Sequence, residues 1–170
     1  MLYFAYGSNL DPDQMRARCP AHRLVGVAAL RDHKLVFPFF SEKWGGGVAS
    51  VQLSHGRDVW GVLHALSEED LLSLDAHEGF HGTGDARNRY EREHAWVELV
   101  RPEDGSVPRR VRAWIYLAHT ANPTAPSRRY VDAILKGARA HHLPDDYIVA
   151  LSRLAVLDEP AEPAPPDTQG

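Results

Sequence analysis

The hydrophobic pattern of the chain predicts a strand-rich core with helices at its edges. Runs of branched and aromatic residues are typical of strands, and apolar positions three and four apart are typical of helices. Strands are predicted at residues 2–6, 24–30, 34–40, 47–53, 58–66, 90–100 and 107–118. Helices are predicted at residues 12–18, 68–78 and 128–141, with a further helix from Pro144 onward. This order predicts an α+β fold with a mostly antiparallel sheet that closes, or nearly closes, into a barrel.

Local signals fix the ends of the predicted helices. Asp11 followed by Pro12 is typical of an N-cap with proline at the first helical position. Ser67 and Asp70 have the spacing of a capping box, and Gly79 is expected to end that helix after Glu78. The last predicted hairpin contains three large aromatic residues that we expect at packed positions: Trp96, Trp114 and Tyr116.

Composition limits the classes of protein that this chain can belong to. Its 170 residues, 44% of them hydrophobic, fit one globular domain at 1–157, followed by a polar, proline-rich tail at 158–170 that we expect to be disordered. A net charge of -4 argues against a nucleic-acid surface. Cys19 is the only cysteine, so an intrachain disulfide is impossible and a cytoplasmic location is expected. No apolar run is long enough to cross a membrane.

The richest chemistry lies between the first predicted strand and the first helix. There the chain reads Tyr6-Gly7-Ser8-Asn9-Leu10. A glycine turn at this place can aim several backbone N–H groups at one point and lets the backbone approach a ligand closely. The turn therefore predicts a site for an anion or a developing oxyanion. The alternative is a tight turn in which Gly7 and Asn9 only supply unusual backbone angles.

Glu78 is the candidate acid/base of the sequence. In a helix over 68–78 it lies within about 60° of Leu71 and Leu74, so it is expected to face the core. Partial desolvation and the negative end of the helix dipole both predict a raised pKa, which suits a general base. The alternative is a solvent-exposed glutamate at a frayed helix end. Asp75 is a weaker candidate, because it can pair with a neighbouring arginine or histidine. The ten histidines show no metal-ligand spacing, so no metal is expected.

Four motifs together resemble the γ-glutamylcyclotransferase family. They are Tyr3-Phe4-Ala5-Tyr6-Gly7-Ser8-Asn9-Leu10, Gly46-Gly47-Val48-Ala49, Val59-Trp60-Gly61-Val62 and Leu74-Asp75-Ala76-His77-Glu78-Gly79. The likeness continues through residues 125–130 to 144 and covers roughly 1 to 150. It implies a compact barrel with flanking helices, no cofactor, a loop at residues 6–9 that holds the glutamyl group, and Glu78 as the acid/base.

The reaction implied is the cyclisation of a γ-glutamyl amide to 5-oxoproline with release of an amine. Tyr6, Tyr90 and Tyr130 are expected to add hydroxyl contacts to the substrate, or else to pack in the core. Family members usually carry a site tyrosine a few residues after the Glu-Gly pair, whereas Tyr90 lies twelve residues after Glu78. A loop inserted at 82–88 is expected to reshape the pocket.

The substrate of such a reaction carries its own nucleophile, the α-amine, and closure forms a five-membered lactam. The protein then has to hold the substrate bent, move protons and stabilise the oxyanion. Two alternatives remain: a hydrolase or acyltransferase acting through Ser8, and a binding module without catalysis. The expected partner is a small γ-glutamyl compound, with neither nucleic acid nor membrane, and the chain is expected to be a monomer or a homodimer.

Overall fold

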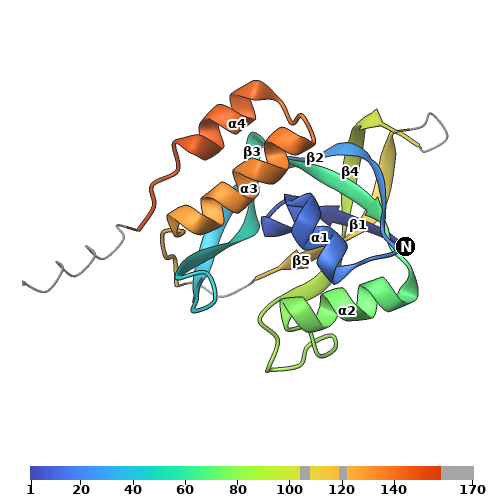
Figure 1. Ribbon diagram of the computed structural model, residues 1–170, viewed down its shortest axis with the longest axis horizontal. Helices are drawn as coiled ribbons and strands as arrows, with labels where there is room; N and C mark the ends of the chain where they lie inside the picture. The colour runs from blue at the N-terminus through green and yellow to red at the C-terminus, as the bar shows by residue number, and fades with distance from the viewer. Residues whose placement is uncertain (104–107, 119–121, 158–170) are drawn as a thin grey trace, which may run out of the picture.

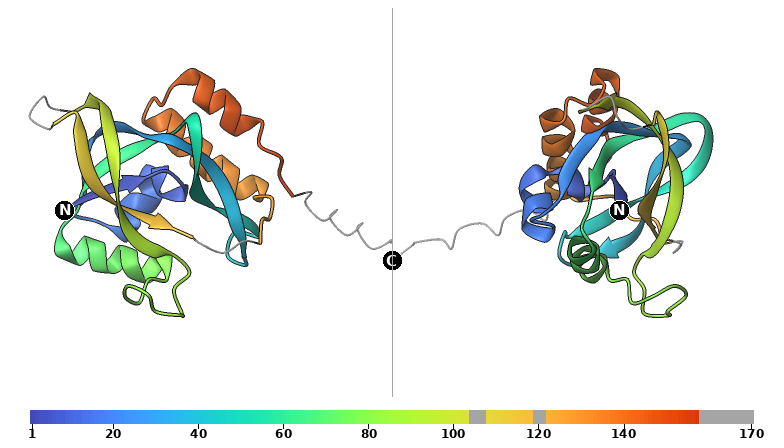
Figure 2. Two further views of the ribbon diagram at one scale, coloured as in Figure 1. Left: turned by 180° about the vertical axis from the view of Figure 1, so that it is seen from behind. Right: turned by 90° about the vertical axis from the view of Figure 1, so that its right-hand side faces the viewer.

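Five strands form a closed barrel in the computed structural model, which describes residues 1–103, 108–118 and 122–157. The strands are β1 (Leu2–Ala5), β2 (Arg23–Ser41), β3 (Gly46–Ala65), β4 (Glu91–Pro102) and β5 (Arg110–Leu117), arranged in the order β1-β3-β2-β4-β5. Every neighbouring pair is antiparallel except β1 and β5, which run parallel with Tyr3 opposite Trp114. Figure 1 and the end-on view in Figure 2 show the barrel with its helices outside. The predicted α+β barrel is confirmed.

The strands β2 and β3 are twice as long as predicted, because each joins two segments that the sequence separates. The predicted segments at 24–30 and 34–40 both lie in β2. The predicted segments at 47–53 and 58–66 lie in β3, except that β3 ends at Ala65, one residue before the predicted end. Their ladder shifts register at three places, between Leu24/Gly26, Arg31/His33 and Val36/Phe39. At the second shift, the polar residues 31–33 of β2 and 54–57 of β3 interrupt the hydrophobic pattern without ending the strand. The predicted division into four strands was therefore wrong.

Four helices and a short 3-10 turn surround the barrel. They are η1 (Ser8–Leu10), α1 (Pro12–Arg18), α2 (Glu68–Glu78), α3 (Arg128–Ala140) and α4 (Asp145–Ser152). The side chains of Asp11, Ser67 and Ser127 cap α1, α2 and α3, as their positions predict. In Figure 1, α3 and α4 lie on one side of the barrel and α2 lies at the other. No helix within the described ranges has the length and apolarity to cross a bilayer.

One residue of the last hairpin does not pack as predicted. Trp96 is 56% exposed, whereas Val97 on the next position of β4 is fully buried. Successive side chains of a strand point to opposite faces, so Trp96 lies on the outer face of the barrel. There the Arg110 guanidinium lies 5.2 Å from its ring centre. Trp114 is partly buried and Tyr116 is buried, as predicted. The predicted disordered tail and most of the turn at 102–106 lie outside the described residues.

Candidate active site

The end of α2 presents Glu78 to the interior of the protein. The capping box between Ser67 and Asp70 begins the helix, and Gly79 ends it in the left-handed conformation at φ 68°. Leu71 and Leu74 pack in the core along the same face. The Glu78 side chain is only 15% exposed, so the predicted inward orientation is confirmed and the frayed surface residue is excluded.

Two side chains from the first eighteen residues hold the Glu78 carboxylate. Asn9 donates from Nδ2 to Oε1 at 3.0 Å, and Arg18 donates from its guanidinium to the same oxygen at 3.1 Å. Arg18 also bonds the Asn9 side-chain oxygen at 2.8 Å. Within the described part of the chain, the second carboxylate oxygen, Oε2, accepts no hydrogen bond. The carboxylate is therefore fixed by one oxygen and has the other available for chemistry.

Burial raises the pKa of the Glu78 carboxyl above its usual value. The Arg18 charge, the Asn9 hydrogen bond and the charges of His77 and Lys43 act in the opposite direction and favour the ionised form. The net effect is upward, because desolvation is the largest of these influences. A carboxyl group with a raised pKa is suited to accept and return protons near neutral pH.

Five tyrosines surround Glu78 in an inner cavity of about 30 Å³. The cavity is lined by Tyr3, Tyr6, Gly7, Ser8, Asn9, Ala49, Glu78, Tyr90, Tyr116 and Tyr130. These residues come from β1, η1 and the two residues between them, from α2, β3, β5 and α3, and from the chain just before β4. The structure thus brings together seven of the eight site residues predicted from the sequence.

The hydroxyl groups of these tyrosines differ in what they can offer to a ligand. Tyr6 donates to the backbone oxygen of Tyr116 at 2.5 Å and Tyr90 donates to the backbone oxygen of Ala49 at 2.8 Å, so their protons are used. Tyr130 instead accepts from the Ala49 N–H at 3.0 Å, and Tyr3 accepts from Asn9 at 2.9 Å. Tyr3 and Tyr130 therefore keep a proton to donate into the cavity. Burial raises the pKa of Tyr130 to about 12, so it stays protonated.

Leu10, the eighth predicted residue, belongs to the core rather than to the cavity. Its side chain is fully buried, and its N–H donates to the Gly7 oxygen at 3.0 Å within η1. Its backbone packs against Gly137 of α3, where any side chain would collide with it. The expected contact of Leu10 with a ligand therefore has no support from the geometry. Gly7 has a different close neighbour, since a Cβ there would lie 3.1 Å from the Tyr130 hydroxyl.

Ser8 lines both the inner cavity and a larger one outside it, but its contacts are those of a hydrogen-bonding residue. Its Oγ accepts from Gln14 Nε2 at 2.8 Å. Among the described residues, no histidine hydrogen bonds to this oxygen, and His77 places its Nδ1 on the backbone oxygen of Ser73 at 2.8 Å instead. A serine nucleophile requires a base within hydrogen-bond reach. The arrangement therefore gives little support to covalent chemistry at Ser8.

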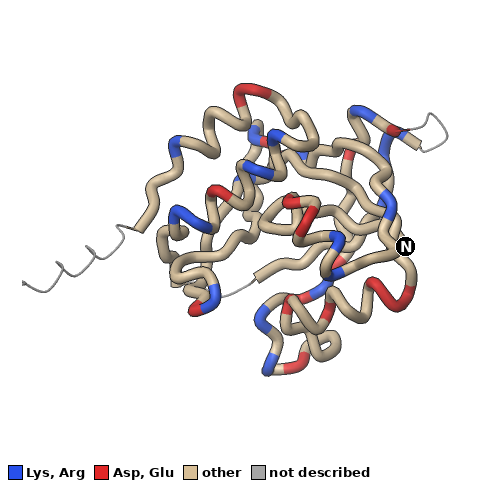
Figure 3. Tube along the Cα trace, viewed as in Figure 1, with Lys and Arg blue, Asp and Glu red and all other residues tan. Residues whose placement is uncertain are grey.

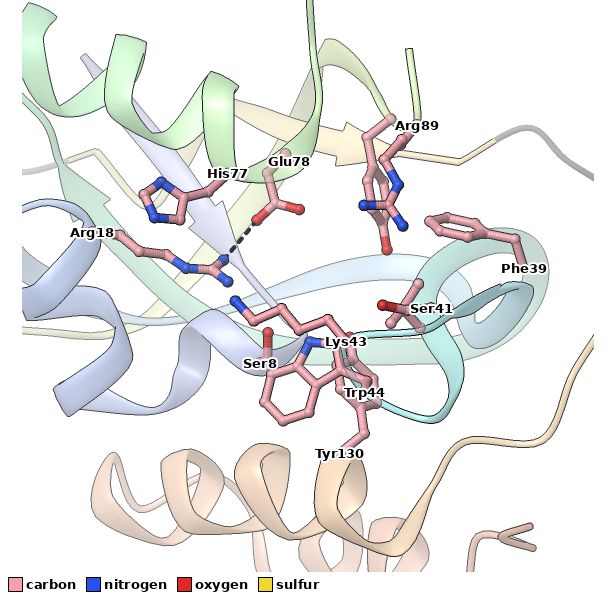
Figure 4. A pocket seen from close by; sticks show the side chains of 12 residues that line it. Ser8, Arg18, Phe39, Ser41, Lys43, Trp44, His77, Glu78, Arg89 and Tyr130 are labelled. Atoms are coloured by element: carbon pink, nitrogen blue, oxygen red, sulfur yellow. Dashed lines mark hydrogen bonds and ion pairs between the residues drawn. The ribbon is translucent and has the colours of Figure 1, made fainter. Parts of the chain in front are cut away.

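The outer cavity, of about 70 Å³, is lined by Glu78 and by the exposed residues Lys43, His77 and Arg89, among others (Figure 4). It is lined by Ser8, Arg18, Phe39, Ser41, Lys43, Trp44, Val48, His77, Glu78, Arg89, Tyr90 and Tyr130. Tyr90 reaches both cavities although the loop at 82–88 separates it from Glu78 in the sequence. No group of three or more metal-ligating side chains in the described part of the chain is arranged to hold a metal ion.

Sequence reasoning missed Arg18, Tyr3, Lys43 and Arg89. The inward orientation of Arg18 could have been predicted from the sequence. Arg18 lies three residues after Met15 on the predicted helix, so the two share one face, and Met15 is buried. Lys43 and Arg89 come from a turn and a loop that are separated by more than forty residues. Only the closed barrel brings them to one cavity.

The chain is similar to known proteins over most of its length. The family model described as "Gamma-glutamyl cyclotransferase, AIG2-like" matches residues 3–134. The gamma-glutamylcyclotransferases of Mus musculus and Homo sapiens are each 32% identical to it, over 86% of this chain and 74% of each relative. A solved structure described as "Gamma-glutamyl cyclotransferase" superposes with a TM-score of 0.81 at 30% identity, and covers 94% of this chain and 90% of that one. The chain therefore belongs to the gamma-glutamyl cyclotransferase, AIG2-like family.

Proposed function

We propose that this chain is a γ-glutamyl cyclotransferase in which Glu78 relays the protons and the substrate supplies the nucleophile. The curated relatives and the structural neighbours support the enzyme class. The observation that carries the mechanism is the Glu78 carboxylate, held by Asn9 and Arg18 through one oxygen inside a tyrosine-lined cavity.

The reaction joins the α-amine nitrogen of the γ-glutamyl group to its own γ-carbonyl carbon. The bond between that carbon and the leaving nitrogen then breaks, which gives 5-oxoproline and a free amine. Two protons pass overall from the attacking nitrogen to the leaving one. In each transfer Glu78 accepts a proton from the attacking nitrogen and returns a proton to the leaving nitrogen, so the enzyme ends in its starting state.

The loop at residues 6–9 and two tyrosines stabilise the charge that develops in this reaction. Among the turn and loop hydrogen bonds of the described residues, the N–H groups of Gly7 and Asn9 have no backbone acceptor, whereas those of Leu10 and Asp11 are used within η1. Backbone donors of this kind can bind the substrate carboxylate or the oxyanion. Tyr130 and Tyr3 add hydroxyl donors, while Tyr6 and Tyr90 shape the cavity and offer oxygen lone pairs.

The finer expectations about partners and location belong to the same proposal. We propose that the substrate is a small γ-glutamyl compound, that residues 1–157 carry the activity without a cofactor, and that the protein works in the cytoplasm as a monomer or a homodimer. The charge distribution supports the absence of a nucleic-acid partner, because basic and acidic residues are interspersed along the trace in Figure 3 rather than gathered by sign.

The test is to identify the products formed from γ-glutamyl-alanine. We expect 5-oxoproline and alanine in equal amounts, measured by mass spectrometry. Free glutamate in place of 5-oxoproline would instead indicate a hydrolase. An acyl group trapped on Ser8 would favour the covalent alternative. Binding by calorimetry without any product would favour a module that has lost catalysis.

A further inference from the structure

The outer cavity carries two positive charges that the catalytic carboxylate does not neutralise. Glu78 is the only carboxylate among its lining residues, and Arg18 already pairs with it at 3.1 Å. Lys43 and Arg89 line the same cavity, and neither forms an ion pair with any carboxylate in the described part of the chain. The mouth of the cavity is therefore cationic and suited to an anion.

Both residues are exposed at the surface, and their side chains line the cavity. In Figure 4, the Lys43 side chain lies below Glu78, and the Arg89 side chain lies to the right of Glu78, near Phe39 and Ser41. The Arg89 guanidinium lies 5.9 Å from the Phe39 ring centre. The backbone N–H of Arg89 donates to the Gly79 backbone oxygen at 3.1 Å. The Arg89 stem packs on Gly79, where a Cβ would lie 2.9 Å from Arg89 Cδ. Lys43 is close enough to Glu78 to act on its pKa.

A neighbouring arginine shows that the free charge of Arg89 is particular to its position. Arg87 lies in the same loop and forms a two-pronged pair with Asp85, at 2.9 and 2.7 Å. Asn88 braces the loop between these arginines by bonds to the Gly82 oxygen at 2.6 Å and to Glu91 at 2.8 Å. The loop thus presents one neutralised arginine to solvent and one unpaired arginine to the cavity.

We propose that Lys43 and Arg89 bind the carboxylate of the leaving amino acid, so that this enzyme selects γ-glutamyl amino acids over uncharged γ-glutamyl amines. The inference rests on the proposed function. The glutamyl group lies against Glu78 and the loop at residues 6–9 in the inner cavity, which places the leaving group in the outer one. A leaving alanine carries one carboxylate there, whereas a leaving alkylamine carries none. Charge-assisted hydrogen bonds from two cations are strong enough to discriminate between them.

The test compares two substrates that differ only in that carboxylate, γ-glutamyl-alanine and γ-glutamyl-alaninamide. We expect the wild type to prefer the carboxylate, and Lys43→Met and Arg89→Met each to lower kcat/KM for γ-glutamyl-alanine about 10-fold. Measured at a pH above the acid limb of kcat/KM, where Glu78 stays ionised without Lys43, activity on the alaninamide should stay within about twofold, because it makes no charged contact there. The double variant should lose the preference. Methionine keeps the packing of the long stem, and Arg89→Lys should recover part of the loss.

Arg87→Met is the matched control, since it removes an arginine from the same loop without removing charge from the cavity. It should leave the ratio of the two kcat/KM values unchanged. Equal losses on both substrates in the Lys43 and Arg89 variants would overturn the assignment. A wild type that forms 5-oxoproline from both substrates at equal rates would also overturn it. In both cases the proposed function would still stand. A wild type that forms 5-oxoproline from neither substrate overturns the proposed function, and this assignment with it.

Discussion

Two carboxylates on α2, three residues apart, have opposite surroundings. Asp75 uses both of its oxygens: Oδ2 lies 2.5 Å from the Arg92 guanidinium, and Oδ1 accepts from the Tyr116 hydroxyl at 2.7 Å. Glu78 uses one oxygen for Asn9 and Arg18. Asp75 and Glu78 are 11% and 15% exposed at the side chain, so burial alone does not separate them. Each carboxylate accepts two hydrogen bonds, and the distribution of these bonds separates them: one falls on each oxygen of Asp75, whereas both fall on Oε1 of Glu78.

The difference indicates which carboxylate is structural and which is available for chemistry. Arg92 lies between the rings of Phe80 and Trp114, at 4.9 and 4.7 Å from their centres, which fixes the partner of Asp75. Both oxygens of Asp75 are therefore engaged by donors of the protein. Glu78 has an open oxygen beside two cavities and a raised pKa. On the proposed mechanism, the same helix thus carries one carboxylate for stability and one for catalysis.

The largest effect is expected from Glu78→Gln. The amide cannot carry the proton, so kcat/KM for γ-glutamyl-alanine should fall about 10²-fold to 10⁴-fold. The amide oxygen can still accept from Asn9 and Arg18, so the melting temperature should change little. Steady-state kinetics and thermal melting check both parts. Full turnover in this variant would contradict the comparison.

Asp75→Asn should show the reverse pattern. It leaves the partly buried Arg92 without a charged partner, which should cost about 1–3 kcal/mol of the free energy of unfolding. For a chain of this size that corresponds to about 2–4 °C per kcal/mol. The folded variant should keep most of its turnover. Urea unfolding measures the stability, and an unchanged midpoint would show that the pair contributes nothing.

Arg18→Gln should move the pH dependence of the reaction. The positive charge of Arg18 is the largest influence that lowers the pKa of Glu78, so its removal should raise that pKa further. Glu78 acts as a base when ionised, and activity is lost as the pH falls through its pKa. The acid limb of kcat/KM should therefore shift to higher pH. An acid limb that does not move would show that Arg18 does not lower the pKa of Glu78. The control is Arg16→Gln, which removes an arginine from the exposed face of α1.

The smallest effect is expected from Ser8→Ala. Loss of a neutral hydrogen-bonding group at the cavity wall should lower kcat/KM by less than about 10-fold. The neighbouring Gln14 should remain bound to Asn9, whose oxygen it contacts at 3.1 Å. Complete loss of turnover, at an unchanged melting temperature, would move the chemistry from Glu78 to Ser8.

The sequence predicted the elements that depend on local chemistry. The bounds of α2 follow from Ser67 and Gly79, and these bounds place Glu78 on the inner face. The turn at residues 6–9 follows from its position between a strand and a proline-initiated helix. In each case the determining residues lie within a few positions of one another, so one stretch of sequence contains the whole signal.

Features that depend on partners far apart along the chain could not be predicted from the sequence. The bulges that keep β2 and β3 continuous arise from their mutual pairing, and the exposure of Trp96 depends on which face of β4 turns outward. The contact of Arg18 with Glu78 joins residues sixty positions apart. The cationic mouth of the outer cavity likewise depends on barrel closure, since neither Lys43 nor Arg89 is part of a motif.

The most direct test of the central claim is the rate of 5-oxoproline formation by Asp75→Asn and Glu78→Gln, measured side by side with γ-glutamyl-alanine at a temperature where both are folded. We expect the Asp75 variant to retain most of the wild-type rate and the Glu78 variant to lose at least about 10²-fold. Equal rates in the two variants would contradict the division of the two carboxylates into a structural and a catalytic one.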